Sequence, residues 1–245
     1  MRFFIICLLS LFLGSCSCSG SGGKERLRIG VDPSWSPLNF DELQPYVNGY
    51  AEDLLLEISQ YSGLEFEKVQ ANWDSLLDGM QRGQYDAALT SLPPYSFNQA
   101  KYDFSIDFLA LGPVLVATTN AKYTEPHQLS GELVGVLMGD PAVLLLEKYP
   151  EIIIRPFNSV PELLDAVVSG ELEAAVLDRL PAMSYVRDLY ADQLKIASEP
   201  LAKSGLHLIA PKGKLQPLIR AFDKSIERFS KKDKLSKLQK KWHLD

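Results

Sequence analysis

The hydrophobic positions of this chain follow two patterns, short apolar runs typical of buried strands and helical spacings typical of amphipathic helices. In residues 49–62 the leucines and the isoleucine that share one helical face are followed by Gly63, a usual helix end. The first group of predicted elements is strand, helix, strand, helix and strand, at residues 27–31, 49–62, 66–69, 73–82 and 85–91. This order predicts βαβ units and a largely parallel sheet.

The same order returns in the second half of the chain. It is predicted there as strand, helix, strand, helix and strand, at residues 133–137, 141–149, 152–156, 160–169 and 173–177. Asp140 before Pro141 is a helix start, and Ser159 with Glu162 forms a capping box. We therefore expect a second α/β unit of the same kind.

Two segments of the chain resemble each other. "LLDGMQRGQYDAAL" at Leu76–Leu89 and "LLDAVVSGELEAAV" at Leu163–Val176 share Leu-Leu-Asp, a helix-ending glycine and Ala-Ala in the same register. Because the match occurs once and its period is too long for a solenoid, two similar lobes explain it better than a repeat array. Further strands are predicted at 194–197 and 206–210, and two terminal helices at 215–229 and 234–242.

The stretch "SLPPYSFNQAKYDFS" at Ser91–Ser105 predicts a strand that ends at two prolines and a helix that begins at Ser96. Ser96 and Gln99 have the spacing of a capping box. An exposed helix start presents unpaired N–H groups and a partial positive charge, so it can hold an anionic group. The sequence therefore raises the question of what lies in front of this helix.

The N-terminus has the composition of an export signal. Residues 1–15 carry a basic start and an apolar run too short to span a bilayer, and Leu13-Gly14-Ser15-Cys16 resembles the bacterial lipobox. We expect a lipoprotein signal peptide at 1–15, lipidation at Cys16 and a flexible Gly/Ser tether at 16–23. The alternative is an ordinary secreted protein cleaved nearby.

Composition and charge narrow the function classes. The chain has 245 residues and a formal net charge of −6, which argues against nucleic acid and against electrostatic adsorption to anionic lipid. The three cysteines all lie at or before residue 18, so no disulfide framework is expected in the folded body. The three histidines lack partners at metal-ligand spacing, and no HExxH, GxSxG or phosphate loop is present. No catalytic residue, metal or cofactor is predicted.

Several stretches, in their order, resemble the bacterial periplasmic solute-binding proteins of the polar amino acid family, solute-binding family 3. They are "LRIGVDPSWSPLNF", "VNGYAEDLLLEISQYSG", "WDSLLDGMQRGQYDAALTSL", "YDFS", "VGVLMGDPA", "ELEAAVLD" and "LQKKWHL". The resemblance covers nearly everything after Gly23. It implies an α/β, two-lobed periplasmic binding protein type II fold, with a ligand cleft between lobes joined by two crossings.

The resemblance also implies where the lobes divide. The crossings would lie near 108–113 and 202–206. Lobe 1 would then take residues 24–110 and 205–245, and lobe 2 residues 111–204. The family delivers a small-molecule ligand to an ABC permease with its ATPase, so a monomer is expected in the periplasm or at the cell surface, anchored through Cys16 and not binding nucleic acid.

The family's ligand-binding positions fall on identifiable residues of this chain. Asp32 would help to bind an amine, Trp35 and Trp73 would pack on the ligand, and Asp178 would hold the ammonium group. The helix-start positions of lobe 2 fall at Gly139 and Asp140, and the cleft turn of lobe 1 at Ser91, Leu92, Pro93 and Asn98. Aromatic faces and carboxylates favour a cationic or amine-bearing solute. Core packing is the alternative role for each tryptophan.

The sequence departs from the family at the cleft turn. Pro93 stands where the family has a threonine, and Asn98 stands where it has an arginine that pairs with the ligand's α-carboxylate. An amide cannot supply a charged, bidentate fork. Three replacements are open: Lys101, Arg179, or a ligand without a free α-carboxylate.

Other functions are compatible with the same sequence. Within the binding class, the rival ligands are an amine, a short peptide or another amino acid derivative. A second class is an enzyme on this fold, since some family relatives dehydrate a cyclic substrate. A third is a sensor or adhesin-like surface lipoprotein. We expect a binding protein rather than an enzyme, because no catalytic constellation is present in the sequence.

Overall fold

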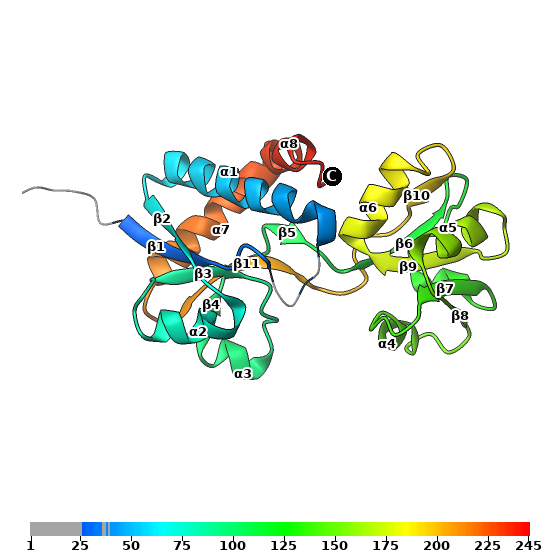
Figure 1. Cartoon of the computed structure of the whole chain (residues 1–245), viewed down its shortest axis with the longest axis horizontal. Helices are drawn as coiled ribbons and strands as arrows, with labels where there is room; N and C mark the ends of the chain where they lie inside the picture. Colours follow the sequence, from blue (N-terminus) through cyan, green and yellow to red (C-terminus); the bar gives the residue numbers. More distant parts are fainter. Residues whose placement is uncertain (1–25, 36–37, 39) are drawn as a thin grey trace, which may run out of the picture.

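The computed structural model describes residues 26–35, 38 and 40–245, which form two α/β lobes side by side (Figure 1). Lobe 1 denotes here the half with a six-stranded sheet, and lobe 2 the half with a five-stranded sheet. The predicted two-lobed α/β architecture is confirmed. The proposed signal peptide, tether and Cys16 lie outside the described residues.

Lobe 1 contains elements from both ends of the chain. Its strands are β1 (Arg26–Val31), β2 (Glu65–Gln70), β3 (Ala87–Thr90), β4 (Tyr102–Phe104), β5 (Leu109–Ala110) and β11 (Gly205–Pro211). Its helices are η1 (Asp41–Leu43), α1 (Gln44–Ser62), α2 (Trp73–Gln81), α3 (Ser96–Gln99), α7 (Gln216–Lys231) and α8 (Lys234–Lys241). The sheet order is β2-β1-β3-β11-β4, and β5 pairs with β11.

Lobe 2 is formed by the middle of the chain. Its strands are β6 (Pro113–Thr118), β7 (Leu133–Leu137), β8 (Ile153–Phe157), β9 (Ala174–Asp178) and β10 (Leu194–Ile196). Its helices are η2 (Pro126–Leu129), α4 (Val143–Leu146), α5 (Val160–Val168) and α6 (Arg179–Asp188). The sheet order is β10-β6-β9-β7-β8.

The two sheets have the same pattern of strand directions. β1 runs parallel to β2 and β3, and β7 runs parallel to β8 and β9. β3 and β9 then each have an antiparallel neighbour, β11 and β6. The two similar segments, Leu76–Leu89 and Leu163–Val176, therefore occupy equivalent helix–strand units, and the prediction of two similar lobes is confirmed.

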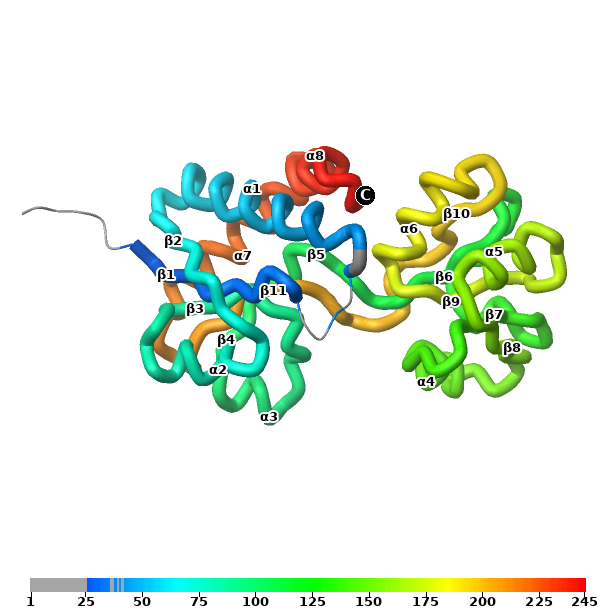
Figure 2. Tube along the Cα trace, in the orientation of Figure 1, coloured from blue at the N-terminus to red at the C-terminus, as the bar shows by residue number. Residues whose placement is uncertain are grey.

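Two extended segments connect the lobes, and Figure 2 shows them running next to each other. The amide of Leu111 donates to the carbonyl of Ser204 at 2.8 Å, and the amide of Leu201 donates to the carbonyl of Pro113 at 2.7 Å. Gly112 is essential to this approach, because a Cβ there would lie 2.1 Å from the Ala202 carbonyl oxygen. The crossings thus form a narrow, hydrogen-bonded ribbon. The exact lobe boundaries, 24–110 with 205–245 and 111–204, stay a prediction.

Helix α1 ties the core of lobe 1 to the first crossing. Its Tyr50 is fully buried, and the Tyr50 hydroxyl donates to the Phe108 carbonyl at 2.7 Å. Helix α7 packs in the same core with the helical spacing that the sequence predicts, burying Ile219, Phe222, Ile226 and Phe229. Each such side chain contributes about 1.5–3 kcal/mol by leaving water. The first crossing therefore begins beside the well-packed core of lobe 1.

Some helices differ in length from the prediction. The first begins at Gln44 rather than at residue 49, because Pro45 fits in the first turn of a helix. The helices expected from Ser96 and over 141–149 are only the single turns α3 and α4. The strands β4 and β6 and the helix α6 are additional to the elements predicted from the sequence.

Helix α6 of lobe 2 also touches lobe 1, close to the C-terminus in Figure 1. Its Leu180 and Met183 are buried in the same apolar cluster as the lobe 1 core. The Arg187 guanidinium donates to the His243 carbonyl at 2.9 Å. In Figure 1, α6 and the C-terminus lie in the upper half of the molecule, and α3 and α4 lie at its lower edge. The two lobes therefore meet at the crossings and along α6.

No helix in the described part of the chain is both long enough and apolar enough to cross a membrane.

Candidate functional site

A cleft of about 690 Å³ lies between the lobes, beside the two crossings. Lobe 1 contributes the turn after β3 and the segment before β5, while lobe 2 contributes the starts of α4 and α6. The lining residues are Ser91, Pro93, Pro94, Tyr95, Ile106, Asp107, Pro113, Asp140, Pro141, Ala142, Leu145, Asp178, Ala202, Lys203, Ser204, Gly205 and His207. Four predicted ligand-binding residues, Ser91, Pro93, Asp140 and Asp178, are among them.

The cleft turn of lobe 1 is held by hydrogen bonds inside the lobe. The buried Thr90 hydroxyl accepts the Leu92 amide at 3.1 Å. The Asn98 side chain is only 8% exposed, and its Nδ2 donates to the Pro93 carbonyl at 2.8 Å. Asn98 and Leu92 do not line the cleft. The amide that stands in the family's arginine position therefore braces the turn.

The predicted cap at Ser96 is wrong. The residue before α3 is Tyr95, no side chain caps the helix, and Ser96 is already its first residue. Gln99 Nε2 instead donates to the Pro94 carbonyl at 2.6 Å. Two prolines keep the chain extended up to Tyr95, so the helix begins later than the capping pattern suggests. A helix of one turn has little dipole, so it is a weak anion site.

In lobe 2 the start of α4 presents a carboxylate. Asp140 Oδ1 accepts the Ala142 amide at 2.7 Å, but α4 begins only at Val143, Ala142 precedes it and no side chain caps it, so the predicted helix start at Asp140 is wrong. Pro141 next to it has no amide hydrogen to offer a ligand. Gly139 has a φ of +79°, so it supplies the sharp turn after β7, and it does not line the cleft.

Asp178 is the last residue of β9 and lines the cleft. Among the described residues its carboxylate has no hydrogen bond or ion pair, and it does not cap α6 although it precedes that helix. Loss of hydration beside the protein surface raises the pKa of Asp178, and the negative charge of Asp140 raises it further. Such a carboxylate is stabilised by any cation that enters the cleft.

Asp32 and Trp35 lie in lobe 1 away from the cleft lining. Asp32 accepts from the Ser34 amide at 2.9 Å and from the Ser34 hydroxyl at 2.7 Å. Trp35 is 2% exposed, and its indole N–H donates to Asn48 Oδ1 at 2.8 Å. A ligand cannot stack on a ring that is buried in this way, so the structure favours the core-packing role for Trp35.

Trp73 is the first residue of α2 and is half-buried against a small cluster around Leu76 and Met80. It does not line the cleft. The aromatic side chain that does line it is Tyr95, which is 59% exposed and lies 5.6 Å from the Phe97 ring between centroids. Tyr95 could not be predicted from the sequence, because an aromatic residue between a proline pair and a helix start carries no distinctive signal.

A buried histidine also reaches the cleft. The His207 ring on β11 lies with Nε2 2.7 Å from the Leu92 carbonyl oxygen and Nδ1 3.1 Å from Asp107 Oδ1. His207 therefore links β11 to both the cleft turn and the segment before β5. A single histidine in an apolar strand gives no functional signal, whereas Asp107 could have been suspected from its place beside the predicted crossing.

The two basic residues that could have replaced the missing arginine do not line the cleft. Lys101 follows α3 in the sequence, and Arg179, the residue after Asp178, is the first residue of α6. The basic residue that lines it is Lys203, which is exposed on the return crossing. Among the described residues no group of three or more His, Cys, Asp or Glu could hold a metal ion.

A second cavity, of about 800 Å³, lies between the segment around η1 and helix α6. It is lined by Phe40, Glu42, Leu43, Pro181, Ser184, Tyr185, Asp188 and Leu189. None of the predicted ligand-binding residues lies in it. The cleft with Asp140 and Asp178 is therefore the candidate site.

Comparisons with known proteins agree with this arrangement. Residues 27–245 match the family model of the bacterial extracellular solute-binding proteins, family 3. The chain is 24% identical to the arginine-binding extracellular protein ArtP of Bacillus subtilis, over 96% of this chain and 93% of that protein.

Two solved structures show the same fold at low sequence identity. The L-cystine solute receptor of Neisseria gonorrhoeae, in its unliganded open conformation, has a TM-score of 0.69 at 20% identity and covers 90% of this chain and 93% of its own. An ancestral cyclohexadienyl dehydratase has a TM-score of 0.68 at 19% identity and covers 89% and 92%. The fold is thus found in both binding proteins and an enzyme.

Proposed function

Since the chain belongs to the bacterial extracellular solute-binding proteins of family 3, we propose that it captures a small amine-bearing solute for an ABC importer. The solute enters the cleft between the lobes, the lobes close about the crossings, and the loaded protein meets a permease driven by its ATPase. An amino acid or an amine-bearing derivative of one is the first candidate, since a relative such as ArtP is named for binding an amino acid. We further propose that the protein acts as a monomer.

The observation that carries this proposal is the free carboxylate of Asp178. It lines the cleft, its pKa is raised by partial desolvation and by the charge of Asp140, and no described side chain pairs with it. An ammonium group would remove this unfavourable interaction by forming a charge-assisted hydrogen bond. The exposed ring of Tyr95 adds a face on which a cation can rest.

A thermal-shift screen of the purified protein tests the proposal. Amino acids, amines and short peptides are added singly, and a ligand at 100 times its Kd should raise the free energy of unfolding by about 2.7 kcal/mol. Uncharged sugars and dicarboxylates serve as controls. If only those controls raise the unfolding midpoint, the solute is not an amine and the proposal is wrong.

Binding should weaken as the pH falls. In the unliganded protein the pKa of Asp178 is raised by poor hydration and by Asp140, whereas a bound cation lowers it. Capture of an amine therefore releases a proton from Asp178, and affinity rises with pH through the raised pKa before levelling off. Calorimetric titrations across the acidic range measure this slope, and the Asp178→Asn variant should show a flatter one.

The unliganded protein should respond to pH in the opposite direction at this group. The folded state holds a proton on Asp178 more tightly than the unfolded chain does. Asp178 therefore destabilises the folded state above its raised pKa, and this effect disappears as the pH falls toward the ordinary aspartate value. The difference in unfolding free energy between wild type and Asp178→Asn, followed with pH, isolates the contribution.

We also propose that the protein is held at a membrane, in the periplasm or at the cell surface, by lipid on Cys16. Cys16→Ala should move the protein from the membrane fraction to the soluble fraction, as judged by ultracentrifugation of lysates. Cys18→Ala is the matched control, two residues along the same segment. Release by the Cys18 change alone, or by neither, would contradict lipidation at Cys16.

A further inference from the structure

The lining of the cleft contains more carboxylates than ammonium groups. Three carboxylates line it, on Asp107, Asp140 and Asp178, and one ammonium group, on Lys203. No arginine is among the lining residues in the described part of the chain. Asp107 Oδ1 of lobe 1 lies 3.1 Å from His207 Nδ1, so a ligand that carries a negative charge meets chiefly the two carboxylates of lobe 2, on Asp140 and Asp178.

At the cleft turn and around Asp140 the backbone gives a carboxylate little compensation. The cleft turn of lobe 1 leads into α3, which is a single turn. On lobe 2 the corresponding position holds Asp140, whose carboxylate already takes the Ala142 amide at 2.7 Å, and Pro141, which has no amide hydrogen. The N–H groups that would bind an anion at a helix start are thus occupied or absent there.

The side chains nearest to the turn are also committed elsewhere. The Asn98 amide donates to the Pro93 carbonyl at 2.8 Å and is 8% exposed, so it points away from a ligand. The His207 ring lies between the Leu92 carbonyl and Asp107. Lys203 is an exposed point charge on a flexible stem, which cannot provide bidentate recognition.

On the basis of the proposed solute-binding function, we propose that the ligand is an amine without a free carboxylate. Examples are an alkyl diamine, a guanidino amine, and the ester or amide of an amino acid. Asp178 binds the ammonium group, and Asp140 excludes free carboxylates by like-charge repulsion. The cleft thereby selects against the zwitterionic amino acids that share the same side chain.

Matched compounds test this directly by isothermal titration calorimetry with the purified protein. Each set holds the side chain constant: arginine, arginine methyl ester and agmatine; lysine, lysine methyl ester and cadaverine; histidine, histidine methyl ester and histamine. We expect at least one ester and its matching amine to bind ten times or more tightly than the free amino acid. A methyl ester has no negative charge but keeps the bulk of the carboxylate group, whereas the amine lacks the whole group. The esters therefore distinguish an effect of charge from an effect of size.

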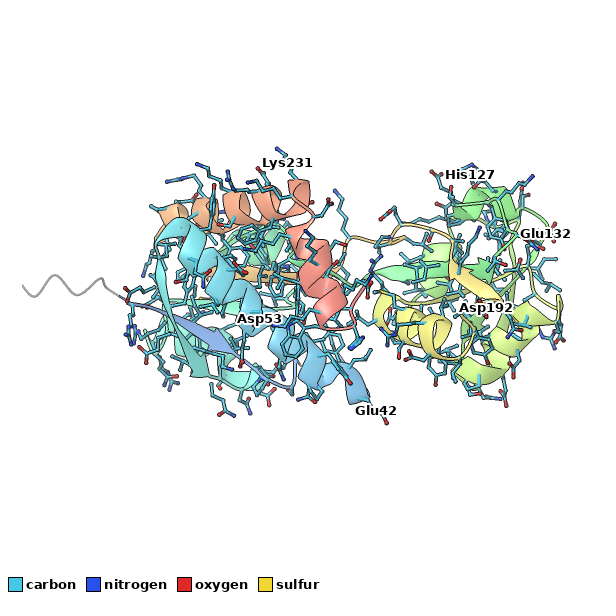
Figure 3. All side chains as sticks on the ribbon, turned by 90° about the horizontal axis from the view of Figure 1, so that it is seen from above. Glu42, Asp53, His127, Glu132, Asp192 and Lys231 are labelled. Atoms are coloured by element: carbon cyan, nitrogen blue, oxygen red, sulfur yellow. The ribbon has the colours of Figure 1, made fainter. Side chains whose placement is uncertain are left out.

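Two variants locate the source of the selectivity. Asp140→Asn keeps an oxygen that can accept the Ala142 amide but removes the charge, so discrimination against the free amino acid should fall several-fold. Lys203→Gln should change the affinities for amine and amino acid by less than twofold. Asp192→Asn, on the surface of lobe 2 outside the cleft (Figure 3), is the matched control and should change neither.

The outcomes separate the two proposals. If a free amino acid binds as tightly as its ester and amine, the carboxylate is tolerated and this inference is wrong, while the amine-binding function stands. A Lys203→Gln variant that loses amino acid binding alone would overturn it in the same way and identify Lys203 as the carboxylate partner. If no member of any set binds, both proposals are wrong.

Discussion

Replacing Asp178 with asparagine lowers the affinity for the bound amine by about tenfold to a hundredfold and leaves the unliganded protein at least as stable as the wild type. The loss of affinity follows from removal of a charged hydrogen-bond partner, worth about 1.5–3 kcal/mol. Stability is retained because the carboxylate has no partner among the described residues and is repelled by Asp140. Calorimetry measures the affinity, and thermal unfolding without ligand measures the stability.

A loss of affinity together with unchanged stability would identify Asp178 as a ligand-binding residue. A residue that matters only for folding would lose stability and affinity together, whereas a ligand-binding residue loses affinity alone. Asp192→Asn removes an exposed carboxylate from the same lobe and should change neither quantity. Unchanged amine binding by Asp178→Asn would remove this residue from the site.

Replacing Gly112 with alanine lowers the free energy of unfolding by about 2–3 kcal/mol and weakens ligand binding with it. The new Cβ would lie 2.1 Å from the Ala202 carbonyl oxygen, which is backbone and cannot rotate away. The crossings must therefore separate, and the hydrogen bond from Leu111 to Ser204 is strained or lost. Urea unfolding and calorimetric binding of the same ligand measure the two effects.

Gly83→Ala provides a control for this variant. Gly83 has a φ of +71° and open space around its Cβ position, so alanine there strains the backbone without a collision. We expect a loss of about 1 kcal/mol and no change in affinity. If Gly112→Ala is no more harmful than Gly83→Ala, the crossings do not pack as closely as described.

Several features of the fold could be predicted because they depend on local pattern. The βαβ order, the glycine ends of helices and the cap at Ser159 are set by residues a few positions apart, and Ser159 Oγ accepts the Glu162 amide as expected. The similarity of Leu76–Leu89 to Leu163–Val176 pointed correctly to two like lobes. Short elements such as α3 and β4 were misjudged, since neighbouring strands rather than local propensity decide their length.

The site was predicted less completely than the fold. Asp140, Asp178, Ser91 and Pro93 lie in the cleft, but Trp35 is enclosed by the lobe 1 core. A tryptophan has the same sequence signature on a ligand and in a core, because both environments are apolar. Tyr95 and His207 are far apart in the sequence. They line the same cleft only because the fold brings the turn before α3 close to β11.

The sequence by itself determined the family, the two α/β units and the replacement of a charged group by Asn98, because each depends on residue identity and spacing. Only the tertiary structure decided what that replacement means. Asn98 donates to the Pro93 carbonyl, Lys101 and Arg179 lie outside the cleft lining, and the carboxylates of both lobes share one cavity. Electrostatic selectivity arises from distances between residues far apart in the chain, and only the folded arrangement of the two lobes fixes those distances.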